Sequence, residues 1–308
     1  MDATPFHDDE IAAQRRAGVS TGGSGIRDFM PEQHRNFFAA LPYVLIATTD
    51  TGGWPIASLL EGNPGFVESP TPQTLRIHSL PPPDDPAAGA LRVGREIGIL
   101  GIELATRRRN RANGVISSVD EGTLTVAVKQ SFGNCPQHIQ RRATSRADNV
   151  RGPVRGFESL DNDTHELIGR ADTFFVASRS RAGVGSNGGA DISHRGGRPG
   201  FVRLKGNTLS IPDFRGNRYL NTLGNLLGEP RSSLLFLDFE TGDVLQLQGL
   251  AGIDWSVSDA DRFEGAERIW HFQVTQGWYR RQAAALRGEL IDYSPVTLRT
   301  GTWGRGEH

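Results

Sequence analysis

The sequence has a single cysteine, Cys135, among its 308 residues. One cysteine cannot form a disulfide within its own chain, and a lone cysteine is most often a small buried hydrophobe. The first residues, from Met1 to Pro5, also lack the basic stretch and the apolar stretch of a secretory signal. These features predict a protein of the reducing cytoplasm whose cysteine is structural.

The sequence also lacks an excess of charge of either sign and any long apolar run. The 34 lysines and arginines are balanced by 35 aspartates and glutamates, for a formal net charge of -1. Such a chain has no long-range field that would attract nucleic acid or an anionic membrane. Runs such as Val44 to Ala47 are far shorter than the ~20 residues that span a bilayer. We therefore expect a soluble protein with neither nucleic acid nor membrane as its partner.

Motifs for metals and for dinucleotides are missing or out of context. The eight histidines and one cysteine show no spacing typical of zinc ligands, so we expect no metal site. Gly183 to Gly188 matches G-x-G-x-x-G, but another strand pattern follows it. A dinucleotide-binding turn must open a helix whose amides face the pyrophosphate. We interpret this motif as a flexible turn between strands.

What the sequence has in quantity is glycine and short apolar runs. Its 38 glycines and 17 prolines separate runs of four to six apolar residues, which predicts strands and few helices. Helices are expected at Pro31–Leu41 and Asp9–Arg16. The predicted strands are Tyr43–Thr49, Ile56–Leu60, Thr74–His78, Glu96–Glu103, Gly114–Val119, Thr123–Val128, Thr173–Ser178, Ala190–His194, Phe201–Leu204, Thr208–Ile211, Ser233–Phe239 and Val244–Gly252.

The order of these signals repeats along the chain. Gly62-Asn-Pro-Gly-Phe-Val67 recurs as Gly197-Arg-Pro-Gly-Phe-Val202, at an offset of 135 residues. Internal similarity of this kind predicts a duplicated β-domain. We expect an N-terminal arm at 1–29, a first half at 30–142, a linker at 143–166 and a second half at 167–308.

Three clusters could carry binding. Ser193-His194-Arg195 lies beside glycines, and such a set can bind phosphate through guanidinium groups and backbone amides. The amide-rich stretch from Asp213 to Asn225 could cap a following helix or bind a phosphate and a heterocycle. The four arginines between Thr106 and Gly114 fit either a solvated loop or a clamp for a polyanionic small molecule.

Taken together, the runs Gln130–Gln140, Thr106–Gly114, Ala190–Val202 and Pro212–Leu227 resemble bacterial pyridoxamine 5'-phosphate oxidase-related flavin-nucleotide-binding proteins. The resemblance implies a mainly β (α+β) fold with two tandem split β-barrel domains of the FMN-binding type and short flanking helices. It also implies FMN as the cofactor, bound at an interface between barrels, and a homodimer. The cofactor-binding residues that it implies are Ser193, His194, Arg195, Asn217, Asn221 and Thr222 near the phosphate, Gln246 beside the ring, and Arg108 and Asn113 from the first half.

The expected function is an FMN-binding oxidoreductase acting on a small-molecule substrate, with the hydride chemistry supplied by the flavin. The sequence identifies neither the substrate nor a catalytic residue. The alternative is a non-enzymatic flavin- or haem-binding split-barrel module, in which His194 would be the natural axial ligand of haem, because one fold serves several functions.

Overall fold

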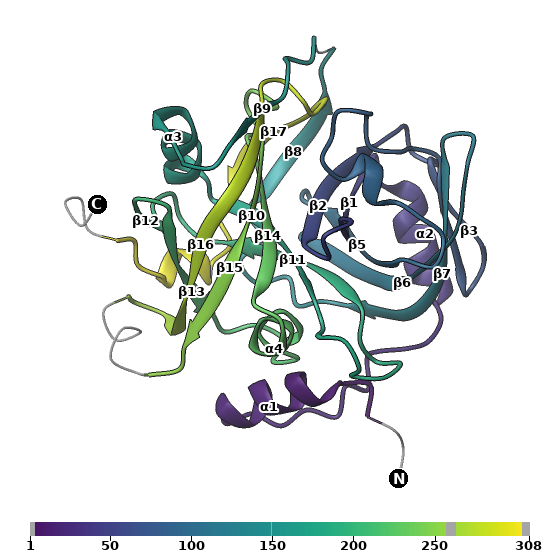
Figure 1. The fold of residues 1–308 in the computed structure, drawn as a ribbon, viewed down its shortest axis with the longest axis horizontal. Helices are drawn as coiled ribbons and strands as arrows, with labels where there is room; N and C mark the ends of the chain where they lie inside the picture. Colours follow the sequence, from purple (N-terminus) through teal and green to yellow (C-terminus); the bar gives the residue numbers. More distant parts are fainter. Residues whose placement is uncertain (1–3, 149, 257–262, 304–308) are drawn as a thin grey trace.

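The computed structural model describes residues 4–148, 150–256 and 263–303, and antiparallel β-sheet dominates it (Figure 1). Residues 1–3 and 304–308, the outer ends of the predicted N-terminal arm and second half, lie outside the described residues. The mainly β class that the sequence predicts is confirmed. None of the described helices is long and apolar enough to span a membrane, and the cytoplasmic location stays a prediction.

The first half begins with helix α2 and continues with seven strands that form one sheet, in the order β2-β1-β5-β6-β7-β4-β3. The helix has Phe37 and Phe38 buried against the sheet. The elements are α2 (Glu32–Ala40), β1 (Tyr43–Thr49), β2 (Pro55–Glu61), β3 (Val67–Thr71), β4 (Thr74–Ile77), the 3-10 helix η1 (Ala88–Ala90), β5 (Glu96–Glu103), β6 (Arg108–Asp120) and β7 (Thr123–Gly133).

The second half has the same plan. Its sheet runs in the order β11-β10-β14-β15-β16-β13-β12, which is the order of the first sheet strand for strand. One helix precedes the sheet in the chain, and a further helix lies between the fourth and fifth strands, counted in chain order. The elements are α3 (Asn162–Arg170), β10 (Thr173–Arg179), β11 (Ala190–Gly196), β12 (Arg203–Lys205), β13 (Thr208–Phe214), α4 (Asn221–Gly228), β14 (Arg231–Leu237), β15 (Val244–Asp254) and β16 (Ala266–Arg280).

The glycine-proline repeat found in the sequence takes the same place in both halves. The amide of Gly62 donates to Pro42 and that of Gly197 donates to Asp172, each just before the first strand of its sheet. Phe66 and Phe201, the aromatic residues of the repeat, are both buried in the core of their own half. The two halves are therefore equivalent in topology and in this detail, as the repeat predicts.

Among the described residues, three further strands, one α-helix and one 3-10 helix lie outside the plan that the two sheets share. Strand β8 (Arg141–Arg146) pairs with β17 (Leu286–Asp292) as a separate ribbon, and β9 (Arg155–Phe157) pairs with β16. The stretch expected to be a linker thus contains paired strands and the start of α3, because partners near the C-terminus give it hydrogen bonds. The domain boundaries themselves remain a prediction. Helix α1 (Asp8–Arg16) packs on α4 (Figure 1), and η2 (Thr297–Arg299) ends the described elements.

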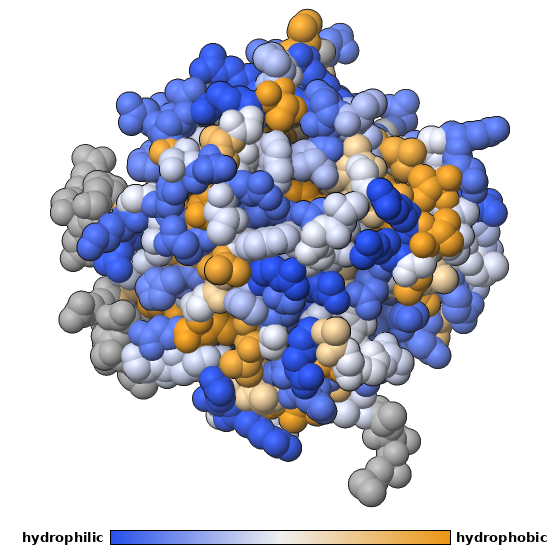
Figure 2. Space-filling view, in the orientation of Figure 1, coloured by the Kyte–Doolittle hydropathy of each residue, from blue (hydrophilic) through white to orange (hydrophobic). Residues whose placement is uncertain are grey.

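Each half has its own apolar core, and a third core joins them. The joining core contains Leu45 and Leu100 of the first half and Phe175, Ile192 and Leu235 of the second, all with 1 % exposure or less. Burial of this kind contributes ~25 cal/mol for each Å² of apolar surface removed from water. The strands β2, β5 and β6 of one half therefore lie fixed against β10, β11 and β14 of the other. On the face shown in Figure 2, apolar side chains outside these cores lie in small groups among polar ones.

The predicted strands are found with small changes at their ends, and three differences matter. Strand β6 begins at Arg108, so most of the arginine stretch is strand, which rules out the solvated loop that was one of its two interpretations. Strand β12 begins at Arg203, after the buried Phe201. Five strands, β3, β8, β9, β16 and β17, were not predicted; the longest of them, β16, has no flanking turn dipeptide that marks it. The motif at Gly183 lies in the hairpin between β10 and β11, as predicted.

The equivalent glycines of the repeat give a test of the duplicated turn. Gly65 and Gly200 have φ angles of 93° and 86°, a region that costs other L-residues roughly 1–2 kcal/mol. We predict that Gly65→Ala and Gly200→Ala each lower the free energy of unfolding by about that amount. Gly169→Ala, in the last turn of α3 with no atom within 4 Å of the added Cβ, should instead raise it by up to about 1 kcal/mol. Urea unfolding of the three variants checks this, and equal effects at all three glycines would contradict it.

Candidate functional site

A cleft between the two halves collects most of the polar residues singled out from the sequence. Strand β6 forms its first wall, and its alternation places Arg109, Arg111 and Asn113 on one face. Arg108 points the other way, is exposed and lies over the ring of Phe37. The arginine stretch therefore contributes Arg109 and Arg111 to the cleft and Arg108 to the exposed surface. We call this region, made by β6, β11 and the start of α4, the arginine cleft.

Strand β11 forms the second wall and is joined to the first by a buried ion pair. Arg111 donates to both carboxylate oxygens of Asp191 at 3.0 Å, and the two side chains are 8 % and 6 % exposed. Asn113 donates to the same carboxylate at 3.1 Å. Arg111 also donates to the hydroxyl of Ser193. A buried pair is tolerated only where further hydrogen bonds support it, and here Asn113 and Ser193 supply them.

Helix α4 closes one end of the cleft with its N-terminus. The Thr222 hydroxyl lies 2.6 Å from that of Ser193, and the Arg111 guanidinium reaches Asn221. The backbone bonds of the helix begin with the amide of Gly224 donating to Leu220. The amides of the first turn lie before that bond, and the helix dipole adds partial positive charge at this end. No side chain of the amide-rich stretch caps this helix, whose N-cap residue is Leu220; Asn221 and Thr222 stand in its first turn and line the cleft, and their role in binding stays a prediction.

The cleft contains buried donors that find no partner among the described residues. The residues that carry them line a cavity of about 80 Å³. This volume holds roughly two or three water molecules, which is the scale of a phosphate group. The unpartnered atoms are Arg109 Nε, Arg111 Nε, Arg195 Nε, His194 Nε2 and Asn134 Nδ2. These atoms have almost no accessible surface, so they do not face the cavity; what the lining offers an acceptor-rich ligand is its arginine, asparagine and threonine side chains.

Charges in the cleft reinforce this interpretation of the donors. Burial, together with the nearby Arg111 and Arg195, lowers the pKa of Arg109 to about 9, so Arg109 is still charged at neutral pH. Burial and nearby arginines, Arg109 and Arg195 among them, hold the pKa of His194 well below its usual value, so this imidazole is neutral. Arg109 donates to His194 Nδ1 over 3.2 Å. A guanidinium has no acceptor, so the proton of His194 is on Nε2, the unpartnered atom.

Two carboxylates also line the cavity and hold arginines in place. Asp213 accepts from Arg195 on one oxygen and from Arg268 on the other. Glu267 pairs with Arg218 at 3.1 Å. The lining then has four arginines, at 109, 111, 195 and 218, against two carboxylates. With Asp191, the partner of Arg111, counted as well, the region still keeps a net positive charge. An anion bound there would be held by charge-assisted hydrogen bonds, which are about twice as strong as neutral ones.

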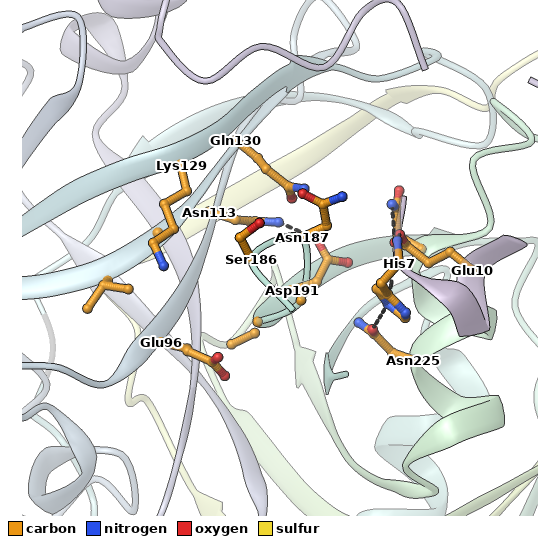
Figure 3. Close-up of a pocket in the computed structure, with 16 residues that line it drawn as sticks. His7, Glu10, Glu96, Asn113, Lys129, Gln130, Ser186, Asn187, Asp191 and Asn225 are labelled. Atoms are coloured by element: carbon orange, nitrogen blue, oxygen red, sulfur yellow. Dashed lines mark hydrogen bonds and ion pairs between the residues drawn. The ribbon is translucent and has the colours of Figure 1, made fainter. Parts of the chain in front are cut away.

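Helix α1 covers the other side of the cleft. Its Glu10 accepts from Asn221 and from the backbone of His7, while His7 itself contacts Asn225 at 2.9 Å. A second, smaller cavity lies here, lined by His7 and Glu10 together with Asn113, Lys129 and Gln130. Figure 3 shows His7 and Glu10 on one side of this cavity and the other three residues on the opposite side. Asn221 lines both cavities. The cover packs closely, since a Cβ added to Gly224 would lie 2.5 Å from the Cα of Glu10.

Six of the nine residues predicted to bind the cofactor line the 80 Å³ cavity, and a seventh lies next to it. Those in the lining are Ser193, His194, Arg195, Asn217, Asn221 and Thr222; Asn113 bonds Asp191 beside them. The structure places Arg108 on the outer face of β6 and Gln246 in a separate cleft on β15. Sequence reasoning missed Arg109, Arg111 and Asn134. The alternation of Arg109, Arg111 and Asn113 is the signal that would have found the first two.

No protein-family model matches this sequence, and no curated protein matches it. Solved structures that the fold is similar to include HupZ from Group A Streptococcus, with a TM-score of 0.29 and 14 % identity over 44 % of this chain and 98 % of that one. A putative pyridoxamine 5'-phosphate oxidase from Lactobacillus delbrueckii has a TM-score of 0.28 and 14 % identity over 34 % and 95 % of the two chains. HutZ, a haem storage protein of Vibrio cholerae, has a TM-score of 0.27 and 14 % identity over 40 % and 94 %. Likenesses this low do not assign the chain to a family.

Glu10 makes the stability of the protein depend on pH. Burial raises its pKa from 4.5 to about 7, against the opposing bonds from Asn221 and His7. A raised pKa in the folded state means that folding takes up a proton between these values, so stability is full below pH 4.5 and falls as pH rises towards 7. Buried histidines with a lowered pKa, such as His194, act in the opposite direction and are present in both proteins. We therefore predict that, relative to Glu10→Gln, wild type loses up to about 3 kcal/mol over this range.

Urea unfolding between pH 4.5 and pH 8 measures the difference between the two proteins. Glu32→Gln is the matched control, because Glu32 is exposed in the first turn of α2 and its loss should leave the wild-type pH profile unchanged. An identical pH profile for Glu10→Gln and wild type would contradict the assignment.

Proposed function

We propose that the arginine cleft binds the phosphate of a flavin nucleotide, FMN, and that the protein is an FMN-dependent oxidoreductase acting on a small-molecule substrate. The observation that carries the proposal is the gathering of four arginines with asparagine and hydroxyl side chains around one cavity at the start of α4. Guanidinium groups give charge-assisted hydrogen bonds to phosphate oxygens, which are about twice as strong as neutral ones. A cavity lined in this way is best explained by an anionic, acceptor-rich ligand.

The residues present suit a phosphate better than a carboxylate. A phosphate has three terminal oxygens that accept from several directions, and Arg109 and Arg195 approach the cavity from opposite walls. The first turn of α4 adds backbone amides, as at other phosphate sites on helix N-termini. These groups would hold the phosphate, and Asn217 and Asn134, which bond each other at 3.0 Å, would flank it. When bound, the flavin would supply the hydride-transfer chemistry.

The choice of a flavin among phosphate-bearing ligands is supported by the resemblance of four runs of this sequence to flavin-nucleotide-binding proteins. In that group the flavin lies between two barrels. Here both walls of the cleft belong to one chain, with β6 from the first half and β11 from the second. A single chain thus suffices to build the proposed site, and the homodimer stays a separate prediction.

The phosphate role predicts that FMN binds more tightly than riboflavin. Each charge-assisted bond to the phosphate is worth about 1.5–3 kcal/mol, so we expect at least about a tenfold difference. Arg109→Met should remove most of this difference, and it leaves no carboxylate unpaired because the hydrogen bond of the Arg109 side chain goes to His194. Arg108→Gln is the control one residue earlier on the outer face of β6 and should keep it. Calorimetric titration measures both, and equal affinities of wild type for the two ligands would refute the phosphate site.

A visible spectrum of the purified protein tests the identity of the cofactor. Flavin absorption near ~450 nm supports the proposal. A Soret band would instead support the alternative of a haem-binding module, with His194 as its axial ligand. Reduction of the bound flavin by a diffusible reductant, followed by reoxidation with substrate turnover, would establish the oxidoreductase; a flavin that no reductant reaches would reduce the role to binding.

A further inference from the structure

The repeated fold builds a second cleft with the same parts as the first. The arginine cleft combines β6 of the first half with β11 of the second. By the repeat, β15 of the second half and β2 of the first must form its counterpart, and these two strands are in contact. We call this region the Asp85 cleft, after the residue that lies in it together with Ser58 and Gln246.

Strand registers show which residues correspond in the two clefts. Arg111 lies opposite Leu100, and Gln246 lies opposite Leu235, 135 residues further on in both strands. Ser58 likewise takes the place of Ser193, since their partners are Ile46 on β1 and Val176 on β10. The Asp85 cleft therefore keeps the serine of the arginine cleft and has a glutamine where that cleft has its central arginine.

The remaining basic groups have no counterpart in the Asp85 cleft. Leu59 and Leu60 stand at the positions of His194 and Arg195, and Val244 stands at that of Arg109. Apolar side chains cannot replace guanidinium donors. Arg151 and Arg280 do line the Asp85 cleft, but Glu61 and Asp85 stand in the same lining and Arg280 is paired with Asp84. The cleft thus lacks the net positive charge that would hold a phosphate.

A carboxylate of the chain itself fills the space beside the serine. The connection between β4 and β5 brings in Asp85, which accepts from Ser58 at 2.9 Å and contacts the Gln246 amide at 3.4 Å. In the second half, the equivalent connection between β13 and β14 contains α4 and brings in Thr222, whose hydroxyl lies beside Ser193. The carboxylate next to that serine, Asp191, is neutralised by its ion pair with Arg111, whereas no arginine among the described residues is paired with Asp85. An ion pair between Asp84 and Arg280 holds the first connection in place.

We propose that the protein has one nucleotide site per chain, in the arginine cleft, and that the Asp85 cleft is a second copy of this site closed by its own carboxylate. A negative charge next to Ser58 and Gln246 repels a phosphate at the one point where the copy retains a donor. The proposal takes the nature of the nucleotide from the proposed function, whereas the number of sites follows from the two clefts alone.

Calorimetric titration of the full chain with FMN, repeated with inorganic phosphate, tests the proposal. We expect one FMN per chain, and two per chain would overturn it. Phosphate binding once per chain without FMN binding would support the single site while refuting the flavin. If neither ligand binds, both proposals fall.

Two variants show which of the two clefts holds the FMN that the titration counts. Arg109→Met, in the arginine cleft, should weaken all FMN binding at least about tenfold. If half of the FMN sites kept wild-type affinity in this variant, the single-site proposal would be overturned. Gln246→Ala is the matched change in the Asp85 cleft and should leave both the number of sites and the affinity within about twofold of wild type. A loss of FMN binding in Gln246→Ala, with the protein folded by circular dichroism, would show that the closed cleft binds the ligand.

Discussion

The ion pair between Arg111 and Asp191 is the interaction on which the site depends. It joins a strand of the first half to a strand of the second and is nearly inaccessible to water. Moving two charges out of water costs several kcal/mol per ion, and only good geometry with extra hydrogen bonds compensates for this. Asn113 and Ser193 provide those bonds. The same groups fix the walls of the cleft, so the contact that aligns the halves also positions the donors.

The apolar core between the halves makes this arrangement rigid. Residues of β1 and β5 pack against β10, β11 and β14, and close-packed interiors allow little adjustment. The two halves approach closely at Gly98, where an added Cβ would lie 2.8 Å from the Cα of Asp191. A glycine at this point of β5 lets the backbone of β11 come near enough for the ion pair to form. Packing and electrostatics therefore act on the same pair of strands.

Covalent duplication explains how the two clefts can differ. In an assembly of identical subunits every interface residue appears in both copies of a site. In one chain with two halves, Arg111 and Gln246 occupy equivalent positions and can be different residues. The same freedom applies to the connections after β4 and β13, one of which brings in a carboxylate and the other a helix N-terminus. The fold thus supplies two frameworks, and side chains decide what each one does.

The sequence alone determined the class of fold, the repeat and most of the strands, because these follow from local patterns. Alternation and turn residues act over a few positions, and the equivalent turns at Gly65 and Gly200 are both in the left-handed region that favours glycine. It also pointed to Ser193, His194 and Thr222, which stand close to glycines or a helix start along the chain.

Only the tertiary structure decided which residues share a site. Arg111 and Asp191 are 80 positions apart, and Gln246 and Ala57 are 189 apart, so no local pattern links them. The burial that leaves Arg109 and His194 with unpartnered donors arises when β6 and β11 meet across the joining core. The closure of the second cleft by Asp85 depends in the same way on a loop that crosses to a strand of the other half. Residue types set what chemistry was possible, and the packing of the two halves set where it is found.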